Sequence, residues 1–254
     1  MSGLKTGLVS ISFRNLEPEK IIALAAACGL DAIEWGGDVH VPHGDVRQAC
    51  EVREMTRKAG LEVSAYGSYY RLTDAEGTPE GVIACAKALG APMIRVWAGN
   101  RGSADASCED RAMVIKNARR MADMARAEGI GIVFEFHGGT LADTAESAIG
   151  LLKDIDRPNV FTHWQPPVGM PDRECLDSLR AVSRLVPYIH VFTWNDRERL
   201  PLEAGTEKWM PLLREAEGWG RDIYALLEFV MNDEPGQLKE DAECLRRWLE
   251  EVHK

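Results

Sequence analysis

Apolar and polar positions along the chain repeat with a period of roughly thirty residues. Four segments share one junction, in which a helix-like stretch ends at a glycine and a short apolar run follows: 27–35, 58–66, 88–97 and 127–136. Glycine suits the left-handed position just past a helix end. Short continuous apolar runs are typical of strands that are buried on both faces. The pattern therefore predicts helices that alternate with buried strands.

Helix-start signals lie ahead of these junctions. Pro18 is placed for a first helical turn, and Thr78-Pro79 starts a similar stretch. Ser107 and Asp110 have the spacing of a capping box, and Asp143 and Glu146 repeat it. These signals predict helices that begin near 18, 79, 108 and 144.

The second half of the chain continues the same rhythm. Apolar runs at 160–164, 188–194 and 223–230 predict strands, and the stretches near 172–185, 206–217 and 235–251 predict helices. With a first strand at 7–13, the count reaches eight strands and eight helices. Such alternation means a parallel sheet, either a closed barrel or an open doubly wound sheet.

The choice between the two sheets depends on nucleotide motifs. No G-x-G-x-x-G follows the first strand, and no G-x-x-x-x-G-K-[ST] occurs in the chain. We therefore expect an α/β fold, a (β/α)8 TIM barrel formed as a single domain by residues 1–254, with no nucleotide cofactor.

Composition narrows the possible partners. Acidic residues outnumber basic ones by 40 to 30, and the net charge of −10 argues against a nucleic-acid partner. No run of 18 apolar residues is present, so no membrane span is expected, and the N-terminus lacks a secretory signal pattern. A cytoplasmic location is the default expectation. The six cysteines form no C-x-x-C pair, which favours reduced, structural thiols.

Polar side chains stand where the predicted strands end. In TIM barrels the carboxyl ends of the strands carry the active site. Here those positions hold Glu34, Arg95, Glu135, His137, His163, Gln165, His190, Trp194 and Glu228.

Glu135 and Glu228 are the most informative of these residues. A carboxylate in an apolar strand is costly unless it is paired or bound to a metal. A buried ion pair of Arg95 with Glu135 would explain one of them, but two glutamates and His190 on separate strands favour a shared site. Side-chain alternation directs Val133, Glu135 and His137 toward the barrel axis, and likewise Tyr224, Leu226 and Glu228.

These residues lie in segments that resemble the xylose isomerase-like TIM barrel superfamily, in its sugar phosphate isomerase/epimerase branch. The resemblance covers nearly the whole chain and includes GLVSISF, GLDAIEWGGDVHVPHGD, FEFHGG, YIHV and ALLEF. It implies one divalent metal ion, Mn, Mg or Zn, held from strands five to eight. By position the implied ligands are Glu135, Gln165, His190 and Glu228.

One segment departs from that family pattern. Relatives usually carry an aspartate at the strand-six ligand position and a histidine three residues later, where this chain has Gln165 and Val168. Glutamine is a neutral and weaker ligand for Mg²⁺ or Mn²⁺. His163 is the alternative ligand at this strand.

The leading functional hypothesis is a metal-dependent isomerase or epimerase that acts on a sugar or polyol through an enediolate. Glu135 and Glu228 would exchange the substrate proton. The expected substrate-binding residues are Glu34, Arg95, His137, His163 and Trp194.

Other readings share the same fold. A dehydratase would use the same site on a polyol, and a non-catalytic small-molecule-binding barrel would account for Gln165 and Val168. A damaged-DNA nuclease is disfavoured by the acidic charge and the short ligand list. Association into a homo-oligomer is left open by the sequence.

Overall fold

A computed structural model describes residues 3–76, 78–167, 169–195 and 197–254; Val168 lies outside this part of the chain. Eight strands form one sheet: β1 (Leu4–Val9), β2 (Ala32–Gly36), β3 (Glu62–Gly67), β4 (Met93–Val96), β5 (Gly131–Phe134), β6 (Val160–Thr162), β7 (Tyr188–Val191) and β10 (Ile223–Leu227). A short antiparallel pair, β8 (Thr193–Trp194) and β9 (Arg199–Leu200), follows β7.

The eight-stranded sheet is parallel and closes on itself. Its strand order is β6-β5-β4-β3-β2-β1-β10-β7. The two end strands meet where Trp164 pairs with Ile189 just beyond β6, and the His190 amide donates to the Trp164 carbonyl at 3.0 Å. The predicted TIM barrel is therefore confirmed.

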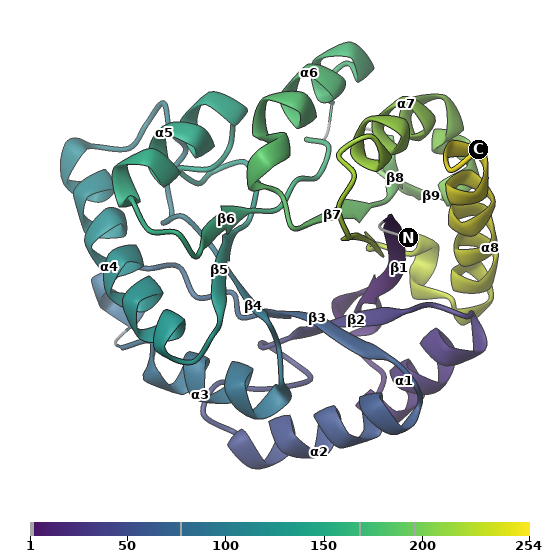
Figure 1. The fold of residues 1–254 in the computed structure, drawn as a ribbon, viewed down its shortest axis with the longest axis horizontal. Coiled ribbons are helices and arrows are strands. Elements are labelled where there is room, and N and C mark those ends of the chain that lie inside the picture. Colours follow the sequence, from purple (N-terminus) through teal and green to yellow (C-terminus); the bar gives the residue numbers. More distant parts are fainter. Residues whose placement is uncertain (1–2, 77, 168, 196) are drawn as a thin grey trace.

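Eight α-helices surround the barrel (Figure 1). They are α1 (Pro18–Ala27), α2 (Val46–Lys58), α3 (Glu80–Leu89), α4 (Cys108–Ala127), α5 (Ala145–Ile155), α6 (Asp172–Val182), α7 (Thr206–Glu217) and α8 (Pro235–Val252). No helix in the described part of the chain has both the length and the apolar content to cross a membrane.

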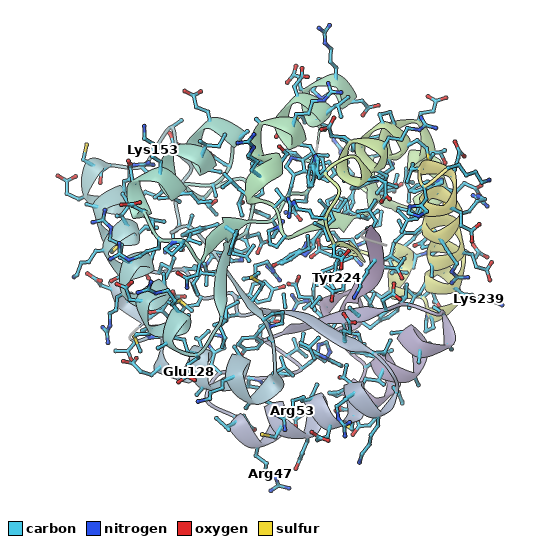
Figure 2. All side chains as sticks on the ribbon, in the orientation of Figure 1. Arg47, Arg53, Glu128, Lys153, Tyr224 and Lys239 are labelled. Carbon is cyan, nitrogen blue, oxygen red and sulfur yellow. The ribbon has the colours of Figure 1, made fainter. Side chains whose placement is uncertain are left out.

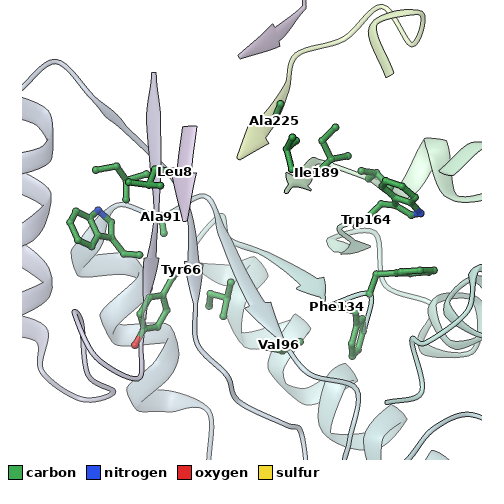
Figure 3. Packing of buried hydrophobic residues seen from close by; sticks show 14 of the residues in the cluster. Leu8, Tyr66, Ala91, Val96, Phe134, Trp164, Ile189 and Ala225 are labelled. Carbon is green, nitrogen blue, oxygen red and sulfur yellow. The ribbon is translucent and has the colours of Figure 1, made fainter. Parts of the chain in front are cut away.

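The main core lies between the sheet and the helices. Leu8, Phe134 and Ile189 from the strands belong to it, together with Trp164 (Figure 3). These side chains are fully buried, which is what two-faced burial of a parallel sheet requires.

A smaller apolar cluster fills the inside of the barrel. It contains Val133, Tyr188 and Leu226, with Tyr224 packed against it. Figure 2 shows Tyr224 near the centre of the ring, whereas Arg47 and Lys239 lie on the outer helices. The predicted inward direction of Val133, Tyr224 and Leu226 is thus confirmed.

Two local predictions about element ends differ from the structure. The first strand ends at Val9, and Ser10–Phe13 form a 3-10 helix, because the Ser10 hydroxyl accepts from the Gly36 amide at 2.9 Å. The capping box of Ser107 and Asp110 is confirmed. Helix α5, in contrast, is capped by Thr144, because the Asp143 carboxylate accepts from the distant Ser103 amide.

Candidate active site

A cavity of about 560 Å³ opens at the carboxyl ends of the strands. The segments that follow β1, β3, β4, β5, β6, β7 and β10 line it, so it occupies the barrel mouth where active sites of this fold lie. Its walls combine aromatic side chains with charged and amide side chains. The lining side chains include Tyr69, Trp97, Phe136, His137, Phe192, Trp194 and Phe229, with Arg14, Glu135, Asp143, Gln165, Arg199, Glu228 and Asp233.

Glu135 and Glu228 are the two glutamates of this lining. Each follows directly after a strand, β5 or β10, and each side chain retains only a small exposed fraction, since both residues are 5% exposed. The last residues of parallel strands point to one end of a barrel, so the two carboxylates are presented to the same space. The prediction that both reach the mouth of the barrel is confirmed by their place in the lining.

Arg95 lies behind Glu135 and is 1% exposed. Its Nη1 donates to Glu135 Oε2, and its Nε donates to Glu34 Oε1 at 2.6 Å. The ion pair of Arg95 with Glu135, considered from the sequence, is therefore present. Both Glu34 and Arg95 are buried and lie outside the cavity lining, and their role in substrate binding stays a prediction.

His190 lies behind Glu228 in a similar way. Its Nε2 is 2.9 Å from Glu34 Oε2, and its Nδ1 is 3.2 Å from Glu228 Oε2, which is ion-pair range without hydrogen-bond alignment. Glu34 thus contacts both Arg95 and His190. These contacts form a buried network beneath the cavity that connects Glu135 to Glu228.

Burial and charge act against each other on these groups. Burial alone would raise the pKa of Glu34, but Arg95 and His190 outweigh it and lower the pKa to about 2. Burial lowers the pKa of His190, but Glu228 and Glu34 raise it to about 9. Burial raises the pKa of Glu135, and the charge of Glu228 adds to this effect against the opposing Arg95. The Glu135 carboxylate therefore holds a proton more strongly than an ordinary glutamate does, which suits an acid–base group.

Five buried atoms of the candidate ligands have no hydrogen-bond partner within the described residues: Gln165 Oε1, His190 Nδ1, Glu228 Oε2 and both ring nitrogens of His163. His190 Nδ1 and Glu228 Oε2 face each other 3.2 Å apart. The Gln165 Nε2 donates to the Phe136 carbonyl at 3.0 Å, which fixes the amide and leaves its oxygen available. Oxygen and imidazole donors suit Mg²⁺, Mn²⁺ or Zn²⁺, so this donor set fits a divalent cation.

Glu135 fits the metal less well than the other three residues, because its Oε2 is held by Arg95. Among residues that the structure describes, no group of three His, Cys, Asp or Glu side chains is arranged to hold an ion. The four-residue ligand set thus remains a prediction.

The other predicted substrate-binding residues divide into two groups. His137 and Trp194 line the cavity, and the His137 ring stacks on Trp97 with 4.6 Å between centroids. His163 is fully buried beneath the site and stacks on His190 at 4.3 Å. Burial lowers the pKa of His163 well below its usual range, so the ring is neutral.

Sequence reasoning missed several lining residues, notably Arg14, Tyr69 and Arg199. Arg14 directly follows the first predicted strand, so a search for polar residues at the end of every predicted strand would have found it. Arg199 belongs to the β8–β9 pair, which carries no clear periodic signal.

Comparison with known proteins agrees with this architecture. The family model described as xylose isomerase-like TIM barrel matches residues 22–248. A curated relative, the 3-dehydroshikimate dehydratase of Bacillus anthracis, is 26% identical over 275 aligned positions, which cover 95% of this chain and 96% of the relative.

Solved structures share the fold over almost the whole chain. A probable 3-DHS dehydratase from Bacillus anthracis has a TM-score of 0.81 at 21% identity, covering 96% of this chain and 99% of that one. A D-allulose 3-epimerase from Methylomonas sp. has a TM-score of 0.73 at 17% identity, with 98% and 99% covered. A barrel from Mycobacterium smegmatis in complex with magnesium has a TM-score of 0.72 at 18% identity, with 99% and 98% covered. The chain belongs to the xylose isomerase-like TIM barrel family.

Proposed function

We propose that this chain is an enzyme that removes a proton from the carbon next to a carbonyl in a small hydroxylated substrate. The observation that carries the proposal is the pair of carboxylates in one cavity, with a buried cation behind each of them. Arg95 and His190 stabilise the two carboxylates in fixed positions, and the aromatic walls restrict water around them. Proton transfer between carbon and oxygen needs no redox cofactor.

Dehydration is the outcome that we favour. One carboxylate takes the proton next to the carbonyl, and the C–H electrons form the enolate. The enolate electrons then form a C=C bond and restore the carbonyl as the C–O bond of the β-hydroxyl breaks, and this oxygen leaves as water with a proton from the other carboxyl group. The relative that is similar over nearly its whole length is a dehydratase, at 26% identity. Glu135 and Glu228 take these two roles, in an order that the substrate pose decides.

Isomerisation or epimerisation of a keto sugar, the leading hypothesis from the sequence, is the second candidate. It is favoured by the same pair of carboxylates, because a proton removed by one side chain can be returned by the other on another face or carbon. The substrate then keeps all its atoms, whereas dehydration releases water.

A divalent cation would be held by Gln165, Glu228 and a neutral His190, which would give up its proton and its Nδ1 contact with Glu228 when the ion binds. When bound, it would lower the energy of negative charge on adjacent substrate oxygens. The contacts that orient the site residues do not depend on which ion is bound. Glu34 orients His190, the Phe136 carbonyl orients the Gln165 amide, and Arg95 holds Glu135.

The experiment is a substrate screen in deuterated water with Mg²⁺ or Mn²⁺ added. 3-Dehydroshikimate tests the dehydratase, and D-allulose and D-tagatose test the epimerase. Dehydration gives a product lighter by one water, and epimerisation gives an isomer that carries one solvent deuterium. If none of the three compounds loses water or exchanges a carbon-bound proton, the proposed chemistry is wrong for these substrate classes.

A further inference from the structure

The rim of the cavity carries two arginines, Arg14 and Arg199. Neither belongs to the buried network behind the glutamates. The guanidinium of Arg199 lies 5.2 Å from the Phe229 ring centroid and 5.8 Å from that of Trp194. The guanidinium of Arg14 lies 5.7 Å from the Tyr69 ring centroid. Each arginine is thus placed against aromatic residues of the cavity wall.

An aspartate holds each of these arginines. Arg199 Nη1 donates to Asp233, and Arg14 Nη1 donates to Asp38. Arg14 Nη2 also donates to the Tyr69 hydroxyl at 3.1 Å. A side chain that is fixed by an ion pair and a ring loses less freedom when it binds a ligand, and this lowers the cost of binding.

The aromatic supports have unusual backbone conformations. Tyr69 and Phe229 have φ values of 57° and 54°, and Asp233 has a φ of 55°. Bulky residues rarely adopt this left-handed region, which costs about 1–3 kcal/mol and is found mainly at functional sites. Three of these left-handed residues contact the two arginines, whereas Leu72, Asp156 and Asn232 share the conformation outside the cavity lining.

Arg199 keeps donors available for a ligand. A guanidinium has five N–H groups. Arg199 donates to Asp233 and to the Val230 carbonyl, both from Nη1, so its Nε and Nη2 have no partner within the described residues. Its side chain is 31% exposed, which is less than the 44% of Arg14.

We infer that Arg199, with Arg14 as a second rim cation, binds a carboxylate group of the substrate. This inference rests on the proposed function, because it takes the ligand of the cavity to be the substrate. It deepens that function by selecting hydroxylated keto acids over neutral keto sugars. The planar N–H fork of arginine matches a carboxylate. Asp233 and Asp38 already balance the two cations, which favours a monoanion over a phosphate dianion.

The binding test uses probes that cannot react. Shikimate is a hydroxylated cyclohexene carboxylate that lacks the ketone, and its methyl ester lacks the negative charge and carries one additional methyl group. Trp97 and Trp194 line the cavity, so their fluorescence reports binding without turnover. Calorimetry on the full chain gives the affinities at constant ionic strength.

The inference predicts that shikimate binds about ten-fold or more tightly than its methyl ester, as expected for a charge-assisted hydrogen bond. Arg199→Gln removes that preference, and Arg199→Lys, which keeps the charge but not the fork, retains part of it. The matched control is Arg47→Gln, because Arg47 pairs with Glu51 on the outer helix α2 (Figure 2). That control leaves both affinities unchanged.

Several outcomes would overturn the inference. These are equal affinity for acid and ester, no binding of either at tens of millimolar, an unchanged preference in Arg199→Gln, or tighter binding of inorganic phosphate than of shikimate. The proposed function fails separately. If shikimate binds as expected but no substrate loses water or exchanges a proton, the carboxylate site stands and the chemistry does not.

Discussion

Glu34 contacts His190 across 156 positions of sequence, with its Oε2 2.9 Å from the imidazole Nε2. The other oxygen of the same carboxylate accepts from Arg95 Nε at 2.6 Å. One fully buried side chain on β2 therefore orients a residue of β7 and a residue of β4. These two cations stand behind the carboxylates of the cavity.

Glu34→Gln should strongly destabilise the protein. The amide keeps the shape but loses the charge, so Arg95 and His190 are left buried with less compensation. Breaking a buried ion pair typically costs about 3–5 kcal/mol. Urea unfolding followed by circular dichroism measures the free energy of unfolding. Glu51→Gln, which removes an exposed ion pair with Arg47, is the control and should leave stability nearly unchanged.

The acid titration of Glu34 is a second prediction. Its pKa is about 2 in the folded protein, against about 4.3 for an ordinary glutamate. Because the folded pKa is the lower one, this group contributes stability above about pH 4.5 and loses it as pH falls toward 2. Carboxyl ¹³C NMR of the metal-free protein should show Glu34 still ionised at pH 3. A midpoint above pH 4 would contradict the described network.

Gly67 on β3 is expected to leave room for this network. A Cβ at that position would lie 2.6 Å from Arg95 Nη2 and 2.8 Å from Glu34 Oε1. Gly67→Ala should therefore destabilise the protein by about 1–3 kcal/mol, as overpacking does. The comparison is Gly236→Ala in the first turn of α8, where nothing lies within 4 Å of the added carbon. Equal unfolding midpoints for the two variants would show that Gly67 is not a spacer.

Gln165→Asp should strengthen the binding of Mn²⁺ or Mg²⁺. The change adds an anionic oxygen where the neutral Gln165 Oε1 is buried and lacks a partner. Calorimetric titration of chelator-treated protein compares the affinities, with Gln48→Asp on α2 as the control. If Gln165→Asp binds the ion no more tightly than the unchanged chain does, Gln165 is not a ligand and His163 becomes the candidate.

The regular parts of this molecule could be predicted from the sequence because each carries a local signal. Glycines past the helix ends, the Ser107 capping box and the alternation along β5 and β10 depend on near neighbours in the chain. The order of these elements predicted a parallel sheet, and the missing nucleotide motifs favoured the closed barrel over an open sheet. Active sites of TIM barrels lie at the carboxyl ends of the strands, and this rule alone predicted that Glu135 and Glu228 share one mouth of the barrel.

The roles of other site residues depend on distant contacts and could not be read in this way. Glu34 and Arg95 lie within β2 and β4, whereas Glu135 follows the end of β5. Glu34 and Arg95 point to one another behind Glu135. Arg199 lies in an irregular segment, and only the fold brings it beside Phe229. Sequence position placed these side chains at the correct end of the barrel but not at the correct depth.

The proposed mechanism requires that Glu135 and Glu228 move a substrate proton. The most direct measurement is the rate at which a substrate identified in the screen loses its carbon-bound proton, by release of water or by exchange with deuterated water, at saturating metal, for the unchanged chain and for Glu228→Gln. The glutamine keeps the shape and removes the basicity, so the rate should fall by about 10²–10⁴-fold. Glu135→Gln should behave alike, and the double variant should be little slower than either single one. A near-normal rate in Glu228→Gln at saturating metal would contradict the account.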